Sequence, residues 1–323
     1  MEQKDPKLIV SVSPHISSGR TTRGIMLDVI IALLPALAAG AVIFGLRSLL
    51  IVAVSIAVCV AGETLFNLIT KRPHTVGDLS AVVTGLILGL NLPASIGVYP
   101  VVIGSLFAII VIKCLFGGLG KNFANPAAAA RVMMLLAFTD AMASTAPIKI
   151  AADAVASPTP LAVMKGAEGA IPKITDMLLG LRGGALGETC AIALLLGGVY
   201  LIIRKVITWH TPVVFIGTVF LLSWAIYGSA GAALVQVLSG GLLLGAIFMA
   251  TDYVTTPTSN LGKCVFALGC GLLTVIIRRF GAYAEGVSYA ILIMNATVWL
   301  LDKAFPPKRF GAVREKKGKE AAK

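Results

Sequence analysis

The chain has 323 residues, of which 57% are hydrophobic and 13% are charged, and its formal net charge is +12. Soluble domains contain about 45 to 50% apolar and about 25% charged residues, so this composition excludes an ordinary soluble protein and indicates a membrane protein with several spans. The basic residues gather at the ends of apolar segments and in the C-terminal tail, as membrane topology predicts, so we expect no nucleic acid partner.

Apolar stretches dominate the chain after a polar beginning. The first 24 residues lack the apolar core of a secretory signal, so we expect the first hydrophobic segment to remain as an uncleaved anchor. Stretches long enough, or nearly long enough, to cross a bilayer core of about 30 Å run approximately over 25–45, 49–69, 79–92, 96–115, 125–139, 187–203, 211–228, 231–250, 264–277 and 285–301. The sequence therefore predicts an all-α polytopic membrane protein with about ten transmembrane helices.

Basic residues orient these stretches, because cytoplasmic loops carry an excess of Lys and Arg. They precede the first stretch and follow the second, fourth and sixth, as Lys4, Lys7, Arg20, Arg23, Lys71, Arg72, Lys113, Lys121, Arg204 and Lys205. Segment 140–186 balances its charges and is expected outside. The predicted order in the cytoplasmic membrane is a cytoplasmic segment 1–24, a first repeat 25–139, an extracytoplasmic loop 140–186, a second repeat 187–302 and a basic cytoplasmic tail 303–323.

Two parts of the chain resemble each other at an offset of about 160 residues. Thr84–Gly89 resembles Gly240–Gly245, and the run that begins at Lys113 resembles the run that begins at Arg278. Five stretches separate equivalent positions, so the second copy is predicted to be inverted relative to the first. Polar residues and proline interrupt both copies, which predicts discontinuous helices, although plain turns between helices are the alternative. The interruptions are Asn91–Pro93 and Thr251–Pro257.

Few ionisable residues lie within the apolar stretches, namely Asp28, Glu63, Arg131 and Asp252. An Asp, Lys or Arg at the centre of a membrane helix costs roughly 2.5 to 3.5 kcal/mol, so each is expected to face the bundle interior or an interface. Glu63 and Asn67 share a helix face at spacing i, i+4. Together with Asp252 they are candidates for a cation path, while the favoured alternative is that Glu63 pairs with Arg131 or with a partner subunit.

The remaining polar candidates are cysteines and two arginines. The five cysteines form no C-x-x-C pair, so we expect small buried side chains and no metal centre held by this chain alone. The inverted repeat places Arg278 and Arg279 outside, against the usual charge bias. They are predicted either to bind a phosphate group or to reach towards lipid headgroups.

Between the two blocks lies a polar, turn-forming stretch, Asp153-Ala-Val-Ala-Ser-Pro-Thr-Pro-Leu161. Pro158 and Pro160 predict an extended or turn-like backbone that holds the hydroxyl of Thr159 outward. Such a side chain is accessible to a modifying enzyme. The alternative is an ordinary loop.

Two runs in the second half carry a resemblance to a known family, Phe248-Met-Ala-Thr-Asp-Tyr-Val-Thr-Thr-Pro-Thr258 and Phe280-Gly-Ala-Tyr-Ala-Glu-Gly-Val-Ser-Tyr-Ala-Ile-Leu-Ile-Met-Asn295. Over almost its whole length the chain resembles the family of the D subunit of the Rnf complex and the B subunit of the sodium-pumping NADH:quinone oxidoreductase. The length, the short N-terminus and the Pro160-Leu161 pair favour the Rnf branch of this family.

In that family FMN is joined through its phosphate to a threonine in an extracytoplasmic loop with the pattern Asp-x-x-Ser-Gly-Ala-Thr. Asp153 and Thr159 match this pattern, while Ala156, Ser157 and Pro158 replace its Ser, Gly and Ala. The resemblance implies covalent FMN on Thr159, with Asp153 assisting recognition by a flavin transferase and Ser157 in the motif but unmodified. The alternatives are a loop without cofactor or attachment at Thr145 or Thr175.

The resemblance also implies a function. The chain would be a membrane flavoprotein subunit that relays electrons between reduced ferredoxin and NAD+ while Na+ or H+ is pumped outward, the flavin supplying the redox chemistry. Its partners would be the other Rnf subunits, of A, B, C, E and G type, and family members are also associated with non-covalent riboflavin. The alternative is a redox-inactive channel or carrier of the urea- or ammonia-channel type, which has no need of the loop around Thr159.

Overall fold

The computed structural model describes residues 19–73, 75–143, 148, 158–281 and 283–307, and every regular element within these ranges is a helix. The predicted all-α class is confirmed. The elements before residue 150 are α1 (Thr22–Phe44), α2 (Leu46–Ile69), η1 (Val76–Asp78), α3 (Ser80–Leu90), α4 (Val98–Leu106), η2 (Phe107–Cys114), α5 (Pro126–Ala137) and α6 (Thr139–Ala143). Those that follow are α7 (Pro160–Met164), α8 (Ile174–Leu179), α9 (Ala191–Ile203), α10 (His210–Tyr227), α11 (Ala230–Leu238), α12 (Leu242–Leu244), η3 (Gly245–Met249), α13 (Asn260–Phe280) and α14 (Val287–Ala304).

Each predicted apolar stretch coincides with a helix or with a broken helix. Four helices, α1, α2, α10 and α13, are long and apolar enough to cross a membrane, and the bent pair of α11 with α12 and η3 adds a fifth. Four shorter apolar helices have 10 to 17 residues. The chain is therefore a multi-pass membrane protein, while the ten crossings and the inverted relation of the repeats stay predictions.

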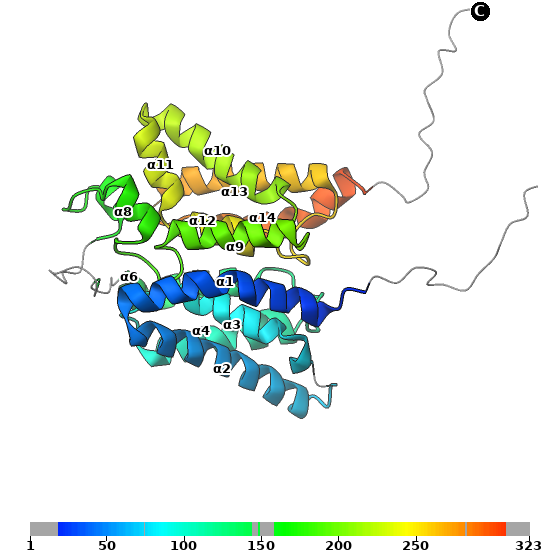
Figure 1. Cartoon of the computed structure of the whole chain (residues 1–323). Coiled ribbons are helices and arrows are strands. Elements are labelled where there is room, and N and C mark those ends of the chain that lie inside the picture. Colours follow the sequence, from blue (N-terminus) through cyan, green and yellow to red (C-terminus); the bar gives the residue numbers. More distant parts are fainter. Residues whose placement is uncertain (1–18, 74, 144–147, 149–157, 282, 308–323) are drawn as a thin grey trace, which may run out of the picture.

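Two groups of helices, α1 to α5 and α9 to α14, meet along α1 and α9 (Figure 1). Glycine permits this close approach. A methyl group on Gly197 of α9 would clash with the carbonyl oxygen of Ala32 in α1. A Cβ on Gly40 of α1 would likewise lie 2.9 Å from the carbonyl oxygen of Leu186, which precedes α9. Small residues at helix contacts are the usual means of association in membranes, where packing replaces the hydrophobic effect as the driving force.

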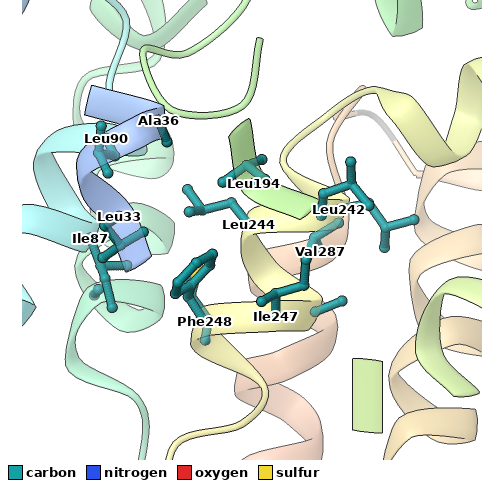
Figure 2. Packing of buried hydrophobic residues seen from close by; sticks show 14 of the residues in the cluster. Leu33, Ala36, Ile87, Leu90, Leu194, Leu242, Leu244, Ile247, Phe248 and Val287 are labelled. Carbon is teal, nitrogen blue, oxygen red and sulfur yellow. The ribbon is translucent and has the colours of Figure 1, made fainter. Parts of the chain in front are cut away.

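Buried apolar side chains of both groups pack across this boundary. Figure 2 shows Phe248 of η3 reaching towards Leu33 of α1 and Ile87 of α3, with Leu244 beside it. Leu33 and Leu244 are wholly buried, and the other two are nearly so. On the outer surface, by contrast, large apolar side chains remain exposed, as expected where lipid or another subunit covers the helices; examples are Leu46, Ile203, Phe280 and Trp299.

The ends of the helices agree with the predicted grouping of charges. The start of α1 and the end of α14 lie at one side of the molecule, and α6 and α8 lie at the opposite side (Figure 1). At the first side Arg20 donates to the carbonyl oxygens of Lys205 at 3.1 Å and Arg204 at 3.0 Å, and Arg204 pairs with Asp28 at 3.3 Å. Lys113 differs from these two arginines in its burial. The charge rule predicts it at a cytoplasmic helix end, but its side chain is only 2% exposed and pairs with a buried glutamate.

Helix α3 ends where the sequence predicts the first interruption, while the choice between a discontinuous helix and a plain turn stays open. The chain leaves the helix at Asn91 and does not re-enter one until Val98. Leu186 and Gly187, from the segment before α9, donate their backbone N–H groups to the carbonyl oxygens of Leu92 at 3.0 Å and Leu90 at 2.7 Å. The second group of helices therefore satisfies polar backbone groups that the interruption frees in the first group.

The second group is interrupted at two places, and the sequence predicts only one of them. The chain is irregular over residues 250–259, which include the predicted interruption Thr251–Pro257. A sharper break, with a bend of 64°, separates α11 from α12. Gly240 and Gly241 adopt φ values of 64° and 66° there, in the left-handed region that glycine tolerates. The sequence indicates these two glycines only as part of the repeat and does not predict this break.

The glycine contact between the groups yields a test. Gly197→Ala is expected to destabilise the protein by about 1 to 3 kcal/mol, because the added methyl group must push α9 away from the Ala32 carbonyl. Gly217→Ala in α10 is a matched control, since nothing lies within 4 Å of the added methyl group. Thermal unfolding of both variants in detergent should show a lower Tm for Gly197→Ala alone. Equal Tm values would contradict the proposed close packing.

Candidate functional site

Two cavities lie between the helix groups, and each occurs beside an interruption. The first, which we call the loop-side cavity, has a volume of about 180 Å³ and is lined by residues of the central segment and of the first interruption. The second, the termini-side cavity, has a volume of about 90 Å³ and is lined by residues near the start of α1, the end of α9 and the irregular stretch after η3.

Thr159 lines the loop-side cavity. It is the N-cap of α7, with an extended backbone (φ −65°, ψ 148°), and its Oγ1 accepts a hydrogen bond from the N–H of Ala162 at 3.3 Å. Pro160 occupies the first turn of the helix, where its missing N–H costs nothing. The expectation of an extended tether therefore holds for Thr159 itself, whereas Pro160 already belongs to a helix. Asp153 and Ser157 lie outside the described residues.

Lys165 follows α7 and connects it to the segment before α14, which forms another part of the cavity wall. The ammonium group of Lys165 donates to the carbonyl oxygens of Gly281 at 2.6 Å and Tyr283 at 2.5 Å. Its partial burial lowers the pKa of Lys165 from the ordinary value. Tyr283, which lines the cavity with Thr159, stacks against Tyr289 with ring centroids 5.5 Å apart. The hydroxyl of Thr159 thus shares a cavity with an aromatic wall.

A buried charge cluster forms part of the wall of this cavity. Arg131 of α5 is 4% exposed and donates to the Oδ1 of Asn91 and to the Oε2 of Glu285. The Oε2 of Glu188 lies 3.6 Å from the same guanidinium group. Arg131 and Asn91 belong to the first helix group and the two glutamates to the second. The predicted pairing of Glu63 with Arg131 is therefore wrong, because Arg131 is held by acids from the other half of the chain, while the pairing of Glu63 with a partner subunit stays a prediction.

Several atoms of this cluster are buried without a hydrogen-bond partner within the described part of the chain. They include the Nε of Arg131, the Oε2 of Glu188, and the Nε and Nη1 of Arg182. The Nη2 of Arg182 donates hydrogen bonds to the carbonyl oxygen of Glu188 at 2.7 Å and to the carbonyl oxygen of Leu238. Buried polar atoms are normally satisfied. Because Arg131 lines the loop-side cavity, its unpaired Nε is a donor that suits a polar ligand there. The sequence alone singles out neither these glutamates nor Arg182.

The two arginines predicted to contact phosphate are placed differently from each other. Arg278 is buried and donates to the carbonyl oxygens of Gln236 at 2.6 Å, Ser239 at 2.9 Å and Gly240 at 3.4 Å. It therefore satisfies the backbone at the break between α11 and α12, and only its Nε lacks a partner among the described residues. Arg279 is exposed. A phosphate contact stays a prediction for Arg279. The guanidinium group of Arg278 is already engaged in hydrogen bonds to the backbone.

The termini-side cavity contains Asp252. Its carboxylate accepts from the hydroxyl of Thr255 at 3.1 Å, and the cavity wall around it includes Phe248 and Tyr253. Between the two cavities lies Met249. Its carbonyl oxygen accepts from Asn125 at 3.1 Å, and its sulfur lies 3.5 Å from the Nδ2 of Asn91. Asn125 lines the termini-side cavity and Asn91 lines the loop-side cavity. Asn125, Met249 and Asn91 therefore form a short bridge of residues between the two cavities.

Glu63 and Asn67 lie together, as their spacing predicts, but away from Asp252. The hydroxyl of Thr75 joins them, accepting from Asn67 at 3.0 Å and donating to Glu63 at 2.7 Å. Glu63 also pairs with Lys113. Within the described ranges no three His, Cys, Asp or Glu side chains are placed to hold a metal ion.

The charge cluster yields a second test. Arg131→Met should destabilise the protein by about 3 to 5 kcal/mol, because two glutamates then remain near each other without their cation. Adding Glu188→Gln to this variant should recover part of the loss. Arg279→Met, which removes an exposed guanidinium, is the control and should leave Tm unchanged. Equal Tm values for the Arg131 and Arg279 variants would contradict the bridging role.

The chain is similar to known proteins over nearly its whole length. A family model described as the NQR2, RnfD, RnfE family matches residues 9–311. The D subunit of the Na(+)-translocating ferredoxin:NAD(+) oxidoreductase complex of Acetobacterium woodii is 45% identical over 319 residues, covering 97% of this chain and 98% of the relative. The D subunit of the proton-translocating ferredoxin:NAD(+) oxidoreductase complex of Clostridium ljungdahlii is 41% identical, covering 94% and 96%. The D subunit of the ion-translocating oxidoreductase complex of Alcanivorax borkumensis is 36% identical, covering 96% and 99%. The chain therefore belongs to the NQR2, RnfD, RnfE family.

Proposed function

We propose that this chain is the D subunit of an ion-translocating ferredoxin:NAD+ oxidoreductase complex, in which it relays electrons through FMN joined by its phosphate to Thr159. The names of the relatives support the complex and the subunit. The observation that carries the flavin is that Thr159 lines one cavity with Tyr283 and Arg131. Its partners are the other subunits of the complex and a flavin transferase.

The residues of the loop-side cavity fit such a group. Tyr283 offers an aromatic surface to a flat ring. The unpaired Nε of Arg131 supplies a buried donor and a positive charge. When bound, FMN supplies one- or two-electron transfer, and the protein positions the ring and sets the charge around it. Lys165 holds the modified helix against the cavity wall.

A covalent bond has a physical purpose at this face. FMN released outside the cytoplasmic membrane is lost by dilution, whereas a phosphoester to Thr159 keeps the cofactor at a high local concentration. The attachment point lies at the start of a short helix that begins with Pro160. Proline limits the conformations of the unmodified chain and lowers the entropic cost of presenting the hydroxyl group.

The termini-side cavity is our candidate for the second, non-covalent flavin, riboflavin. Phe248 and Tyr253 line it, and the bridge through Met249 separates it from the loop-side cavity by few residues. The polar groups in its wall, Asp252 among them, belong to the proposed cation path together with Glu63 and Asn67. No observation favours the alternative of a redox-inactive channel, since side chains from both helix groups fill the space between the two cavities.

The proposed topology has ten crossings in two inverted repeats, both termini in the cytoplasm and the central segment outside. Lys173 and Lys303 are exposed lysines near opposite ends of the helices. A membrane-impermeant amine reagent applied to intact cells should label Lys173 and spare Lys303, and both should react after lysis. Mass spectrometry of the two peptides measures this. Labelling of Lys303 alone in intact cells would reverse the proposed orientation.

Flavin attachment is tested directly on Thr159. The chain produced with its flavin transferase should carry the mass of FMN less water on the peptide of residues 150–165, and the band should fluoresce on a denaturing gel. Thr159→Ala should abolish both signals, because no other hydroxyl occupies the cap position of α7.

Thr175→Ala is the matched control, since Thr175 lies in α8 of the same central segment and should leave the flavin in place. A fluorescent Thr159→Ala band would move the attachment site elsewhere. An unmodified wild-type peptide under these conditions would overturn the flavoprotein proposal.

A further inference from the structure

A lysine ammonium is buried inside the first helix group. Lys113 is 2% exposed, and its Nζ lies 3.0 Å and 2.9 Å from the two carboxylate oxygens of Glu63 and 2.6 Å from the hydroxyl oxygen of Ser80. All of these partners are oxygen atoms. Carboxylate and hydroxyl oxygens are also the ligands that hard metal cations take in proteins, so the ammonium occupies a cage that suits a free cation.

The oxygen atoms of this cage are held in place by further hydrogen bonds. Thr75 donates to the Oε1 of Glu63 at 2.7 Å and accepts from Asn67 at 3.0 Å. The Oδ1 of Asp78 accepts from the hydroxyl group of Ser80 at 2.5 Å and from its N–H at 2.7 Å. The cage is therefore a positioned set of groups from α2, η1 and α3, and does not depend on the lysine side chain to arrange it.

Space is available on both sides of the ion pair. Glu63, Asn67 and Thr75 line a pocket of about 390 Å³ whose lining also includes Arg72 and Lys121. On the other side, Lys113 and Ser80 line the termini-side cavity. The Lys113–Glu63 pair is thus the barrier between a polar surface pocket and the space between the two helix groups.

Burying such a pair is costly for the fold. Removing two charges from water carries a desolvation penalty that their attraction often fails to offset, and apolar replacements of buried pairs are frequently neutral or stabilising. Lys113 moreover lies in η2, which is a π-helix, and π-helical segments inside α-helices occur frequently at functional sites. Both features indicate that the pair is retained for function.

We propose that Glu63 and Ser80, with Thr75 orienting the carboxylate of Glu63, form a binding site for a small monovalent metal cation, and that Lys113 closes this site by filling it with its own ammonium group. When the ammonium moves into the termini-side cavity, where Asp252 lies on the wall contributed by the second helix group, a cation from the surface pocket takes its place beside Glu63. Glu63 then has one cation in each state, so no charge is left unpaired.

This proposal rests on the proposed function for its role in transport. A negative charge arriving in the termini-side cavity would draw the ammonium of Lys113 away from Glu63 and admit the cation. Lys113 thereby couples the charge in the termini-side cavity to cation binding beside Glu63. It acts as a positioning residue, because its ammonium group competes with the transported ion for the same oxygen atoms.

The test measures cation binding by the purified full chain in a Thr159→Ala background, without flavin or flavin transferase. Lys113→Met should gain a saturable rise in Tm of a few degrees when NaCl replaces choline chloride at constant ionic strength, because Na+ fills the emptied site. The wild-type side chain should give no such rise. Lys121→Met, which removes an ammonium from the same pocket without emptying the cage, should behave as the wild type.

The double variant Lys113→Met with Glu63→Gln should lose the response to Na+. A Lys113→Met protein with the same Tm in NaCl and choline chloride, or an equal response in the double variant, would overturn the proposal. Failure of Lys113→Met to fold in NaCl while the double variant folds would also overturn it, because Na+ should replace the missing ammonium. Since no flavin is present, these outcomes are independent of whether Thr159 carries FMN.

Discussion

The pairing of Arg131 with acids from the opposite half of the chain is the interaction on which the arrangement of the molecule depends. A guanidinium group buried in an apolar protein must be compensated, and Arg131 finds Glu188 and Glu285 only when the two helix groups are joined. The same contact places Asn91 and the first interruption against the segment before α9. Charge compensation therefore fixes the boundary at which both cavities form.

The cavities lie beside interrupted helices, and two of the interruptions obtain hydrogen-bond partners from elsewhere in the fold. The carbonyl oxygens of Leu90 and Leu92 accept from the segment before α9, and those at the break after α11 accept from Arg278. Non-helical backbone survives at membrane depth only where protein satisfies it. The polar groups that remain unpaired, such as the Nε of Arg131, then face a space that a ligand can occupy. The need to give buried backbone groups and buried charges a partner therefore shapes both the fold and the candidate site.

The sequence predicts much of this architecture, because apolar stretches and prolines report local structure directly. The helices, the end of α3 before Asn91 and the extended backbone of Thr159 all follow from short-range signals, whereas the helix that begins at Pro160 is not predicted. Pairings between distant residues do not. Lys113 resembles a basic residue at a cytoplasmic helix end until the fold places Glu63 beside it, 50 positions away in the chain. The charge rule counts residues near span ends and contains no information on tertiary partners.

The central claim is that the flavin attached to Thr159 occupies the loop-side cavity between the two helix groups. An electron cryo-microscopy map of the assembled, flavinylated complex tests it most directly. We predict density continuous with the Oγ1 of Thr159, with the ring between Tyr283 and Arg131. Density that leaves Thr159 and extends away from this chain, with the loop-side cavity filled by side chains or lipid, would contradict the account.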